Sequence, residues 1–433
     1  MLHRPGEQEP SRHDGSGSFL TPAGGGELRV GMVGHGFMGA VHSLAWRSAP
    51  VAFGLAVPVA LVALAGRDPA ATAAAARRFG WSEPETDWRR LVERDDLDVV
   101  DICTPGDSHA EIALEALRAG KHVLCEKPLA NSVAEAEAMA AAAASASALG
   151  VRSMVGFNYR RVPAVALARD LVAAGRLGRV RHVRACYLQD WLVDPDFPLT
   201  WRLQRDRAGS GALGDLGAHV VDLVGFVTGE ELVGVSALAE TFVGERPLPE
   251  PAGAARGLGG RGGAGRGPVD VDDAVVALGR LARGGLVTLE ATRMAPGRKN
   301  ALRFEVNGSE GSVSFDFESM NELWVHEVGS AHAGVGGFTR VLVTEPDHPY
   351  LEGWWPPGHG LGYDHSFANQ ARDFVEAVRS GQDPSPSFAD GLAVQRVLDA
   401  VEASAAAGAA WTSCVVGGLA GEPATRLEEG SRR

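Results

Sequence analysis

Short apolar runs alternate with stretches of helical periodicity along the first third of the chain. The apolar runs end at Val33, Ala65, Pro105 and Cys125, and alanine-rich or amphipathic segments separate them. Apolar runs of this length, separated by helical segments, are typical of buried strands in a parallel sheet. The pattern therefore predicts an α/β fold that begins with a doubly wound domain over residues 28–152.

The pattern of the chain changes after this first domain. Four later segments alternate apolar and polar positions, as half-buried strands do, and glycine turns join them into antiparallel hairpins. These segments are 180–191, 231–242, 272–294 and 302–318. Helical patterns accompany them over 163–174, up to 378, and over 388–407. We expect a C-terminal α+β domain over 153–420, with helices on one face of a mostly antiparallel open sheet.

Three segments rich in glycine, proline or polar residues fall outside both domains and are predicted to be disordered. They are an N-terminal tail over 1–27, an insertion over 245–268 and a C-terminal tail over 421–433. The first tail lacks the apolar core of a signal peptide. The apolar run Ala49–Ala65 approaches the length of a membrane span, but two prolines and a glycine interrupt it. A loop followed by a buried strand is the preferred interpretation, so we expect no membrane contact.

Bulk composition restricts the class of partner. The 433 residues carry 54 acidic and 41 basic side chains, a formal net charge of −13. Such an excess of acid disfavours a broad nucleic-acid-binding surface. The four cysteines have neither metal-ligand nor redox spacing. We interpret them as reduced thiols and expect a cytoplasmic protein without a metal.

The sequence GHGFMG stands between the first predicted strand and a helical segment. Its first glycine would make the turn, its second would let a pyrophosphate reach the backbone, and its third would let the helix pack on the strand. The phosphates would then face the helix N-terminus. This order of strand, glycine turn and helix predicts a Rossmann dinucleotide-binding domain. The expected cofactor-binding residues of the loop are Gly34, His35, Gly36, Phe37, Met38 and Gly39.

Residues at the ends of the next strands extend the predicted cofactor site. After the second strand, Asp68 would accept hydrogen bonds from ribose hydroxyls, which favours NAD, whereas Arg67 would pair with a 2′-phosphate, which favours NADP. The residues leave NAD(H) and NADP(H) open. Ligands of open α/β sheets bind at the carboxyl ends of the strands. The further candidates there are Thr104, Pro105, His109, Glu126 and Lys127.

The stretch GALGDLGAHVVD, Gly211–Asp222, is the predicted centre of the chemistry. Asp215 and His219 are four residues apart, and Asp222 follows three further on, so a helix would present all three on one face. A histidine beside a carboxylate is a plausible proton-transfer pair. The glycines between them indicate that something approaches the backbone closely.

These motifs, in this order, resemble the Gfo/Idh/MocA oxidoreductases, the family of glucose–fructose oxidoreductase and inositol 2-dehydrogenase. They are the glycine loop, Thr104-Pro105, Glu126-Lys127-Pro128, and the set Asp215, His219 and Asp222. The resemblance covers about 28–416. It implies NAD(H) more than NADP(H), although Gly66-Arg67 stands where many NAD-using members have an acidic residue. It also implies a homo-oligomer, a dimer or tetramer, formed through the open C-terminal sheet.

The aromatic loop Gly353–Phe367 further resembles the levoglucosan dehydrogenase-like branch of that family, which acts on sugar rings or cyclitols. The resemblance implies a nicotinamide-dependent oxidoreductase that interconverts a secondary alcohol and a ketone on such a ring. His219 would be the general acid/base, Lys127 would stabilise the developing alkoxide, and Asp215 would bind a substrate hydroxyl or orient His219. For Asp222 a structural hydrogen bond is an equal alternative. Further residues expected to bind a polyol substrate are Asn158, Tyr159, Gln189, Trp191, Trp201 and Arg202.

Three other functions fit parts of the pattern. An NAD-dependent glycosidase on the same fold would oxidise a sugar, eliminate and reduce it again. A non-catalytic NAD-binding regulator would not need the set Lys127, Asp215 and His219. A metal site from Asp215, His219 and Asp222 lacks a further cysteine or histidine at ligand spacing.

Overall fold

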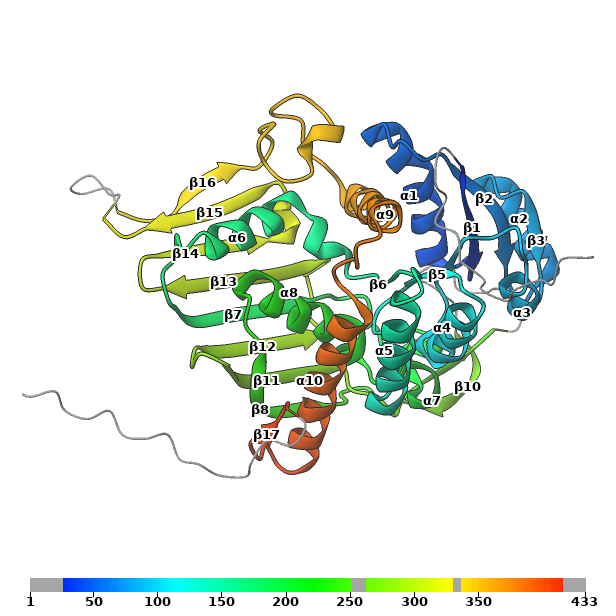
Figure 1. Ribbon diagram of the computed structural model, residues 1–433. Coiled ribbons are helices and arrows are strands. Elements are labelled where there is room, and N and C mark those ends of the chain that lie inside the picture. The colour runs from blue at the N-terminus through cyan, green and yellow to red at the C-terminus, as the bar shows by residue number, and fades with distance from the viewer. Residues whose placement is uncertain (1–25, 251–261, 330–335, 416–433) are drawn as a thin grey trace, which may run out of the picture.

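The computed structural model describes residues 26–250, 262–329 and 336–415, which form two lobes side by side (Figure 1). The first lobe contains a six-stranded parallel sheet in the order β3-β2-β1-β4-β5-β6. Its strands are β1 (Leu28–Val33), β2 (Val59–Ala65), β3 (Glu83–Glu85), β4 (Val99–Ile102), β5 (His122–Cys125) and β6 (Ser153–Val155). Its helices are α1 (Phe37–Phe53), α2 (Pro69–Phe79), α3 (Trp88–Val92), α4 (His109–Arg118) and α5 (Val133–Ser147). The strands that end at Val33 and Ala65 are where the apolar pattern predicted them, and β6 lies just past the expected domain boundary.

A helix from the C-terminal part of the chain completes this first lobe. Helix α9 (Tyr363–Ser380) lies beside α1 (Figure 1). Phe374 of α9 packs edge-on against Trp46 of α1, with ring centroids 6.2 Å apart. Both rings are buried in one core with β1 residues such as Met32. The first sheet is therefore covered partly by chain that follows the second sheet in sequence.

The second lobe contains a nine-stranded sheet in the order β16-β15-β14-β13-β7-β12-β11-β8-β17. Every neighbouring pair is antiparallel except β7 with β12. The strands are β7 (Val180–Leu188), β8 (Leu232–Glu240), β11 (Ala274–Leu281), β12 (Leu286–Thr292), β13 (Ala301–Gly308), β14 (Gly311–Asp316), β15 (Glu322–Glu327), β16 (Thr339–Leu342) and β17 (Thr412–Ser413). Helices α6 (Pro163–Ala173), α8 (Ala218–Thr228) and α10 (Phe388–Ala406) cover one face (Figure 1). A parallel α/β lobe beside a mostly antiparallel α+β lobe confirms the predicted fold class.

The predicted disordered insertion is partly ordered, which corrects that prediction. Strands β9 (Glu245–Pro249) and β10 (Gly262–Pro268) pair as an antiparallel hairpin, and residues 251–261 lie outside the described part. Arg246 anchors the hairpin because its buried guanidinium donates at 2.7 Å to the carbonyls of Leu192 and Asp194. These tertiary contacts overcome a composition that, taken alone, disfavours structure.

The apolar run Ala49–Ala65 forms the last residues of α1, a connecting loop and the whole of β2. Within the described residues, one helical stretch, Arg205–Thr228, has the length and hydropathy of a membrane span. Of its most apolar window, 83% is buried inside the protein, as in a core helix.

Candidate active site

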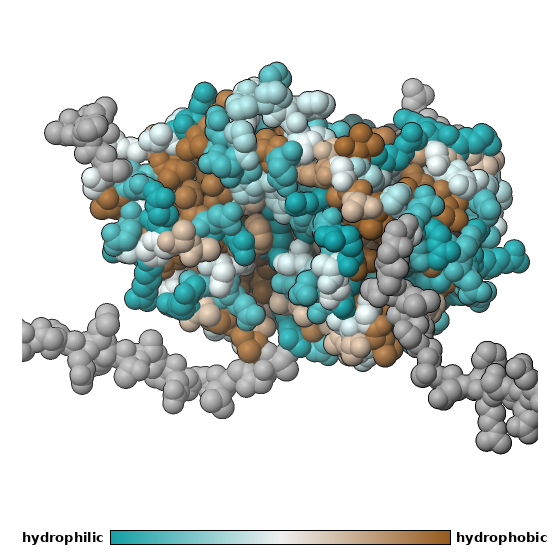
Figure 2. Space-filling model, turned by 45° about the horizontal axis from the view of Figure 1, so that its top comes forward, coloured by the Kyte–Doolittle hydropathy of each residue, from teal (hydrophilic) through white to brown (hydrophobic). Residues whose placement is uncertain are grey.

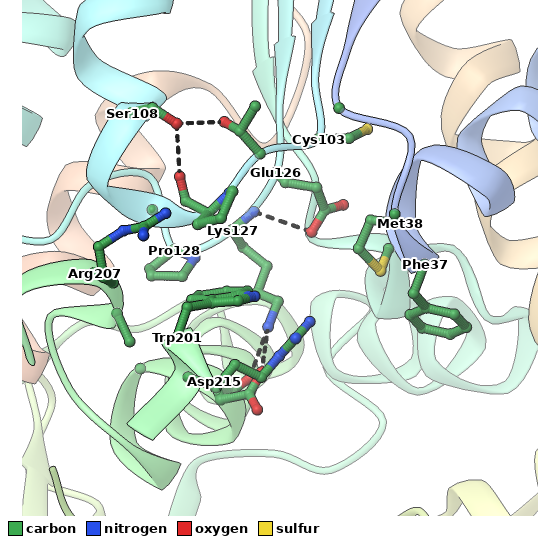
Figure 3. A pocket seen from close by; sticks show the side chains of 18 of the residues that line it. Phe37, Met38, Cys103, Ser108, Glu126, Lys127, Pro128, Trp201, Arg207 and Asp215 are labelled. Atoms are coloured by element: carbon green, nitrogen blue, oxygen red, sulfur yellow. Dashed lines mark hydrogen bonds and ion pairs between the residues drawn. The ribbon is translucent and has the colours of Figure 1, made fainter. Parts of the chain in front are cut away.

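A cavity of about 750 Å³ lies where the two lobes meet, and the surface is hollowed between them (Figure 2). Its walls come from the loops after β1, β4 and β5 on one side and from the second lobe on the other (Figure 3). Most of the predicted site residues line it. They are Gly34, His35, Gly36, Phe37, Met38, Arg67, Thr104, Pro105, Glu126, Lys127, Asn158, Tyr159, Gln189, Trp201, Arg202, Asp215 and His219.

The glycine loop has the geometry of a phosphate cradle. Gly34 has a φ of 101°, and a Cβ there would lie 2.6 Å from the Cys103 carbonyl oxygen. A Cβ at Gly39 would lie 2.1 Å from the Gly34 carbonyl oxygen. At Gly36, by contrast, a Cβ would meet nothing within 4 Å, and no side chain caps the start of α1. Uncapped helix amides facing open space fit a dinucleotide pyrophosphate.

Three residues predicted to contact the ligands are not among those that line the cavity. The Asp68 carboxylate accepts a 2.8 Å hydrogen bond from the Ala71 amide and so caps α2, while Arg67 is the residue that lines the cavity. His109 is buried, with its ring nitrogens 2.9 Å from the Thr104 and Pro128 carbonyl oxygens. It therefore ties two cavity loops together. Trp191 packs under Arg293 and donates at 2.8 Å to the Gln189 Oε1 atom.

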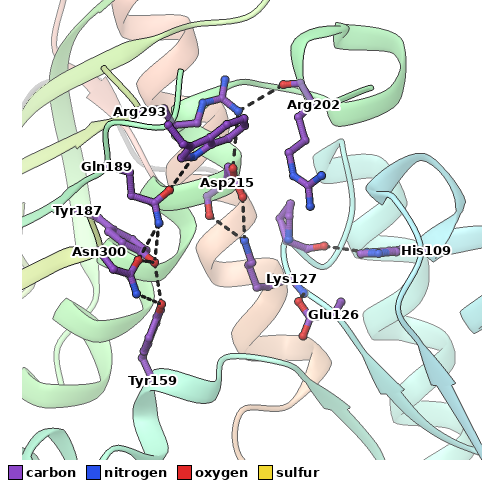
Figure 4. A network of polar contacts seen from close by, with 12 residues as sticks. His109, Glu126, Lys127, Tyr159, Tyr187, Gln189, Arg202, Asp215, Arg293 and Asn300 are labelled. Atoms are coloured by element: carbon purple, nitrogen blue, oxygen red, sulfur yellow. Dashed lines mark hydrogen bonds and ion pairs between the residues drawn. The ribbon is translucent and has the colours of Figure 1, made fainter. Parts of the chain in front are cut away.

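A lysine from the first lobe reaches an aspartate of the second (Figure 4). Lys127 Nζ donates to the Asp215 carbonyl oxygen at 2.7 Å and to its Oδ1 at 3.3 Å. Arg293 Nη1 lies 3.6 Å from the other carboxylate oxygen, Oδ2. Although burial by itself raises the pKa of Asp215, the cations Lys127, Arg202 and Arg293 lower it well below its usual range. Asp215 is therefore an ionised acceptor on the cavity wall.

The segment that carries Asp215 is a π-helical turn, and this corrects the prediction of one regular helix face. Residues Leu213–Gly217 form the π turn, and α8 begins only at Ala218. The Asp272 carboxylate fixes its start by accepting the Gly211 amide at 2.7 Å and the Leu213 amide at 2.8 Å. A Cβ at Gly211 would lie 1.8 Å from the Asp272 carbonyl oxygen. This glycine is thus required by the protein's own packing, and not by a ligand.

Asp222 is turned away from the cavity, so the expected face of three polar residues is wrong. Its carboxylate accepts hydrogen bonds from Arg160 Nη2 at 2.6 Å and from Arg160 Nε at 3.0 Å. Burial raises the pKa of Asp222, and the Arg160 guanidinium opposes that rise. The pair is a structural ion pair inside the second lobe, which decides between the two alternatives for Asp222. It also removes Asp222 from a metal site with Asp215.

His219 lies buried at the cavity wall, with the Tyr159 ring edge-on at 4.6 Å between centroids. Neither of its ring nitrogens hydrogen-bonds to a residue within the described ranges, Asp215 included. Burial and the Lys127 ammonium lower the pKa of His219 well below its usual range, against the opposing effect of Asp215. His219 is therefore a neutral imidazole whose unprotonated ring nitrogen is free to accept a proton from a ligand.

A polar network extends along β7 from Tyr159, whose ring packs against His219 (Figure 4). The Tyr159 and Tyr187 hydroxyl oxygens lie 2.7 Å apart, and the Tyr187 hydroxyl donates to Asn300 Oδ1 at 2.6 Å. Gln189 Nε2 donates to the same Asn300 oxygen at 2.7 Å. Sequence reasoning missed Tyr187 and Asn300. Tyr187 was detectable, because strand alternation places it on the same face as Gln189, whereas nothing near Asn300 marks it.

Positive charge accumulates on the second-lobe side of the cavity. The Arg202 guanidinium stacks over the Trp201 ring at 4.3 Å and has no hydrogen-bond partner within the described part of the chain. Arg207 and Lys299 lie at the rim, paired with Asp107 and Asp190. Further lining residues that sequence reasoning missed are Asn131, Arg207, Arg293, Lys299 and Tyr363.

A glycine phosphate cradle, a lysine at a strand end and a neutral histidine in one cavity define a nicotinamide-dependent oxidoreductase. Comparison with known families agrees. Residues 28–157 match the oxidoreductase family with an NAD-binding Rossmann fold, and residues 165–314 match the GFO/IDH/MocA C-terminal domain. The chain belongs to the Gfo/Idh/MocA oxidoreductase family, as the resemblance implied, and NAD(H) is its cofactor.

Three known proteins illustrate the similarity. A levoglucosan dehydrogenase from Pseudarthrobacter phenanthrenivorans is 47% identical over 384 residues, which cover 88% of this chain and 96% of that protein. The crystal structure of an oxidoreductase domain protein from Kribbella flavida superposes with a TM-score of 0.85 at 60% identity, covering 90% of this chain and 99% of that one. A levoglucosan dehydrogenase in complex with NADH and levoglucosan superposes with a TM-score of 0.82 at 43% identity, with the same coverage.

Proposed function

We propose that this protein is an NAD-dependent dehydrogenase that interconverts a secondary alcohol and a ketone on a sugar, anhydrosugar or cyclitol ring. An anhydrosugar of the levoglucosan type is the first candidate substrate, because a similar solved structure holds NADH and levoglucosan. The observation that carries the proposal is the juxtaposition in one cavity of Lys127, Asp215 and a neutral His219 whose acceptor nitrogen has no partner among the described residues. Oxidation of an alcohol requires a proton acceptor and a group that stabilises a developing alkoxide, and this set provides both.

Each of these residues has a separate role in the proposed reaction. Bound NAD⁺ supplies the acceptor for the hydride that leaves the substrate carbon. His219 takes the hydroxyl proton, which a neutral imidazole can do. Lys127 has three donors, two of which point to Asp215, so the third is available to the reacting oxygen. Asp215 accepts a hydrogen bond from a neighbouring substrate hydroxyl and holds Lys127 in place.

The rest of the cavity suits a polyol. Gln189, Asn158 and Arg202 present amide and guanidinium groups, and Trp201 offers a flat face for a sugar ring. The free guanidinium of Arg202 provides a donor without breaking a protein contact. Recognition would therefore combine several hydrogen bonds with one stacked surface.

Two measurements test this function. Fluorescence titration with NADH and NADPH should show NADH binding, and binding of neither cofactor would refute it. Sugars, anhydrosugars and inositols should then be screened for NAD⁺ reduction. Cleavage of a chromogenic glycoside with no added acceptor would instead indicate a glycosidase.

We further propose a homo-oligomer formed through the open face of the second sheet, in the cytoplasm. Apolar side chains on that face are exposed, namely Leu238, Val276, Leu278 and Leu286. Leu238 on β8 and Val276 on β11 are direct neighbours in register, so they form a continuous patch. Light scattering after size exclusion should show the molar mass of a dimer or tetramer. Leu278→Arg should lower that mass towards the value of a monomer. A monomeric wild-type protein would contradict the oligomer without affecting the assigned reaction.

A further inference from the structure

A buried cluster of charges behind the cavity takes no part in the reaction described above. His42, on α1, is 2% exposed and lies between two carboxylates. Its Nδ1 is 2.9 Å from Asp101 Oδ2, and its Nε2 is 3.0 Å from Glu126 Oε1. Trp46 Nε1 donates to the same Asp101 oxygen at 2.7 Å. Of the three charged groups, Glu126 is the one that lines the cavity.

The surroundings of His42 determine its charge. Both ring nitrogens face carboxylate oxygens, and an imidazole donates twice only when it is protonated. Burial, the largest single influence, lowers the pKa of His42, but the charge of Asp101, the hydrogen bond to it and the neighbouring Cys103 together hold the pKa well above its usual range. The His42 ring therefore joins Asp101 to Glu126, and Glu126 is the carboxylate that faces the cavity.

Glu126 is held in a fixed position. The Lys127 amide donates to Glu126 Oε2 at 3.3 Å (Figure 3), while His42 Nε2 lies 3.0 Å from the other oxygen. Gly156 leaves the necessary space, because a Cβ there would lie 2.7 Å from Glu126 Oε1. The carboxylate is thus oriented by three separate parts of the first lobe.

The position of Glu126 identifies its partner. In this fold a dinucleotide lies across the carboxyl ends of the strands, with its pyrophosphate at the loop after the first strand. Glu126 follows β5, on the side of the sheet remote from Arg67, where the nicotinamide half would bind. Its neighbour in sequence is Lys127, which reaches the reacting oxygen in the proposed reaction.

We propose that His42 and Asp101 are positioning residues that hold the Glu126 carboxylate beside the nicotinamide and thereby favour binding of NAD⁺ over NADH. The nicotinamide ring of NAD⁺ carries a positive charge that the reduced ring lacks, so a fixed carboxylate stabilises the oxidised form more. Without the His42 ring, Glu126 Oε1 would lose the contact that fixes it, and the carboxylate would no longer be held in one orientation. The inference rests on NAD binding and does not depend on which sugar is oxidised.

The test compares the dissociation constants of NAD⁺ and NADH, measured by calorimetry without substrate. In Glu126→Gln, the ratio Kd(NAD⁺)/Kd(NADH) should rise about tenfold, equivalent to one lost charge interaction of ordinary size. His42→Gln should raise the same ratio at least about threefold, and the double variant should not exceed Glu126→Gln, because both changes act through one carboxylate. His122→Gln is the matched control. This buried histidine stands at the opposite end of β5, where it accepts the Arg152 amide at 2.9 Å, and its variant should keep the wild-type ratio.

Equal weakening of NAD⁺ and NADH binding in Glu126→Gln, with an unchanged ratio, would overturn the proposal and leave the cluster a purely structural role. Should His42→Gln fail to fold, Glu126→Gln decides, since it retains the pair of His42 with Asp101. Because no sugar is present, an incorrect substrate assignment would not alter this result.

Discussion

The two walls of the cavity are built by different means. The wall from the first lobe consists of backbone at the glycine loop and of short loops directly after β1, β4 and β5. The opposite wall consists of side chains from distant segments, such as Tyr159, Gln189 and Asn300, held by hydrogen bonds to one another. In the proposed function, backbone geometry would recognise the part of the cofactor common to all dinucleotides, and side-chain chemistry would select the substrate. Mutations should therefore separate cofactor binding from turnover.

The largest fall in kcat should follow a mutation in the second-lobe wall of the cavity. His219→Gln should lower kcat by about 10³-fold, the size of a lost general base, while the NADH dissociation constant stays unchanged. Steady-state kinetics and NADH titration measure the two quantities. His182→Gln, on β7, is the matched control. Loss of NADH binding in His219→Gln would mean that the two walls are not separable.

Lys127 belongs to the first lobe but reaches across to the second. Lys127→Met should lower kcat by about 10²-fold, because a donor to the developing alkoxide is lost. Lys121→Met is a suitable control, since Lys121 Nζ donates to the backbone carbonyls of Arg94 and Leu97 instead. Turnover within a few-fold of wild type in Lys127→Met would exclude the alkoxide role.

The cofactor wall can be altered without straining the fold. At Gly36 a Cβ has open space and the φ is −70°, so Gly36→Val should leave the thermal unfolding temperature unchanged. The added side chain would occupy the place of the pyrophosphate, and NADH affinity should fall about tenfold or more, at least 1.4 kcal/mol. Calorimetric scanning and NADH titration check both parts. Unchanged affinity would place the phosphates elsewhere.

The pH dependence of kcat/KM tests the electrostatic effect of Lys127, on the first-lobe wall, on His219, on the opposite wall. Because the pKa of His219 is lowered, kcat/KM for alcohol oxidation should stay constant as the pH falls through the usual histidine value of about 6.5, and drop only at lower pH. Lys127→Met removes a neighbouring positive charge, so the pKa of His219 should rise and the acidic limb of the residual activity should move to higher pH. A limb that moves to lower pH would contradict the assigned electrostatics.

Asp222 should have the smallest effect on activity. Asp222→Asn breaks a buried ion pair with Arg160 and should lower the free energy of unfolding by about 3 kcal/mol. The kcat of the folded enzyme should remain within about twofold of wild type, because Asp222 does not line the cavity. Urea unfolding and kinetics at low temperature measure these separately. Asp215→Asn should instead lower kcat strongly and change the free energy of unfolding less.

The same difference between walls explains what could be predicted from the sequence. The glycine loop and the placement of Lys127 after a strand depend on consecutive residues, so local patterns identified them. His219 and Asp215 were found because they stand close together in one motif. Asn300 and Arg293 could not be found in this way, because they reach the cavity only through the pairing of β7 with β12 and β13.

Tertiary contacts also account for the predictions from the sequence that were wrong. The π turn at Leu213–Gly217 depends on Asp272, some sixty residues away, and helical spacing alone cannot reveal it. Asp222 was assigned to the wrong face because its partner Arg160 comes from another segment. The hairpin of β9 and β10 was missed because its composition is typical of disorder, while its stability comes from the buried Arg246.

The position of α9 has a consequence for synthesis of the chain. Phe367 and Phe374 share one buried core with α1 and the first sheet, yet they follow that sheet by more than two hundred residues. During translation the N-terminal lobe emerges long before this covering helix, so its apolar face stays open until residue 380 has left the ribosome. We therefore expect nascent chains that end before α9 to depend on chaperones and to be sensitive to protease, even though they already contain the whole glycine loop.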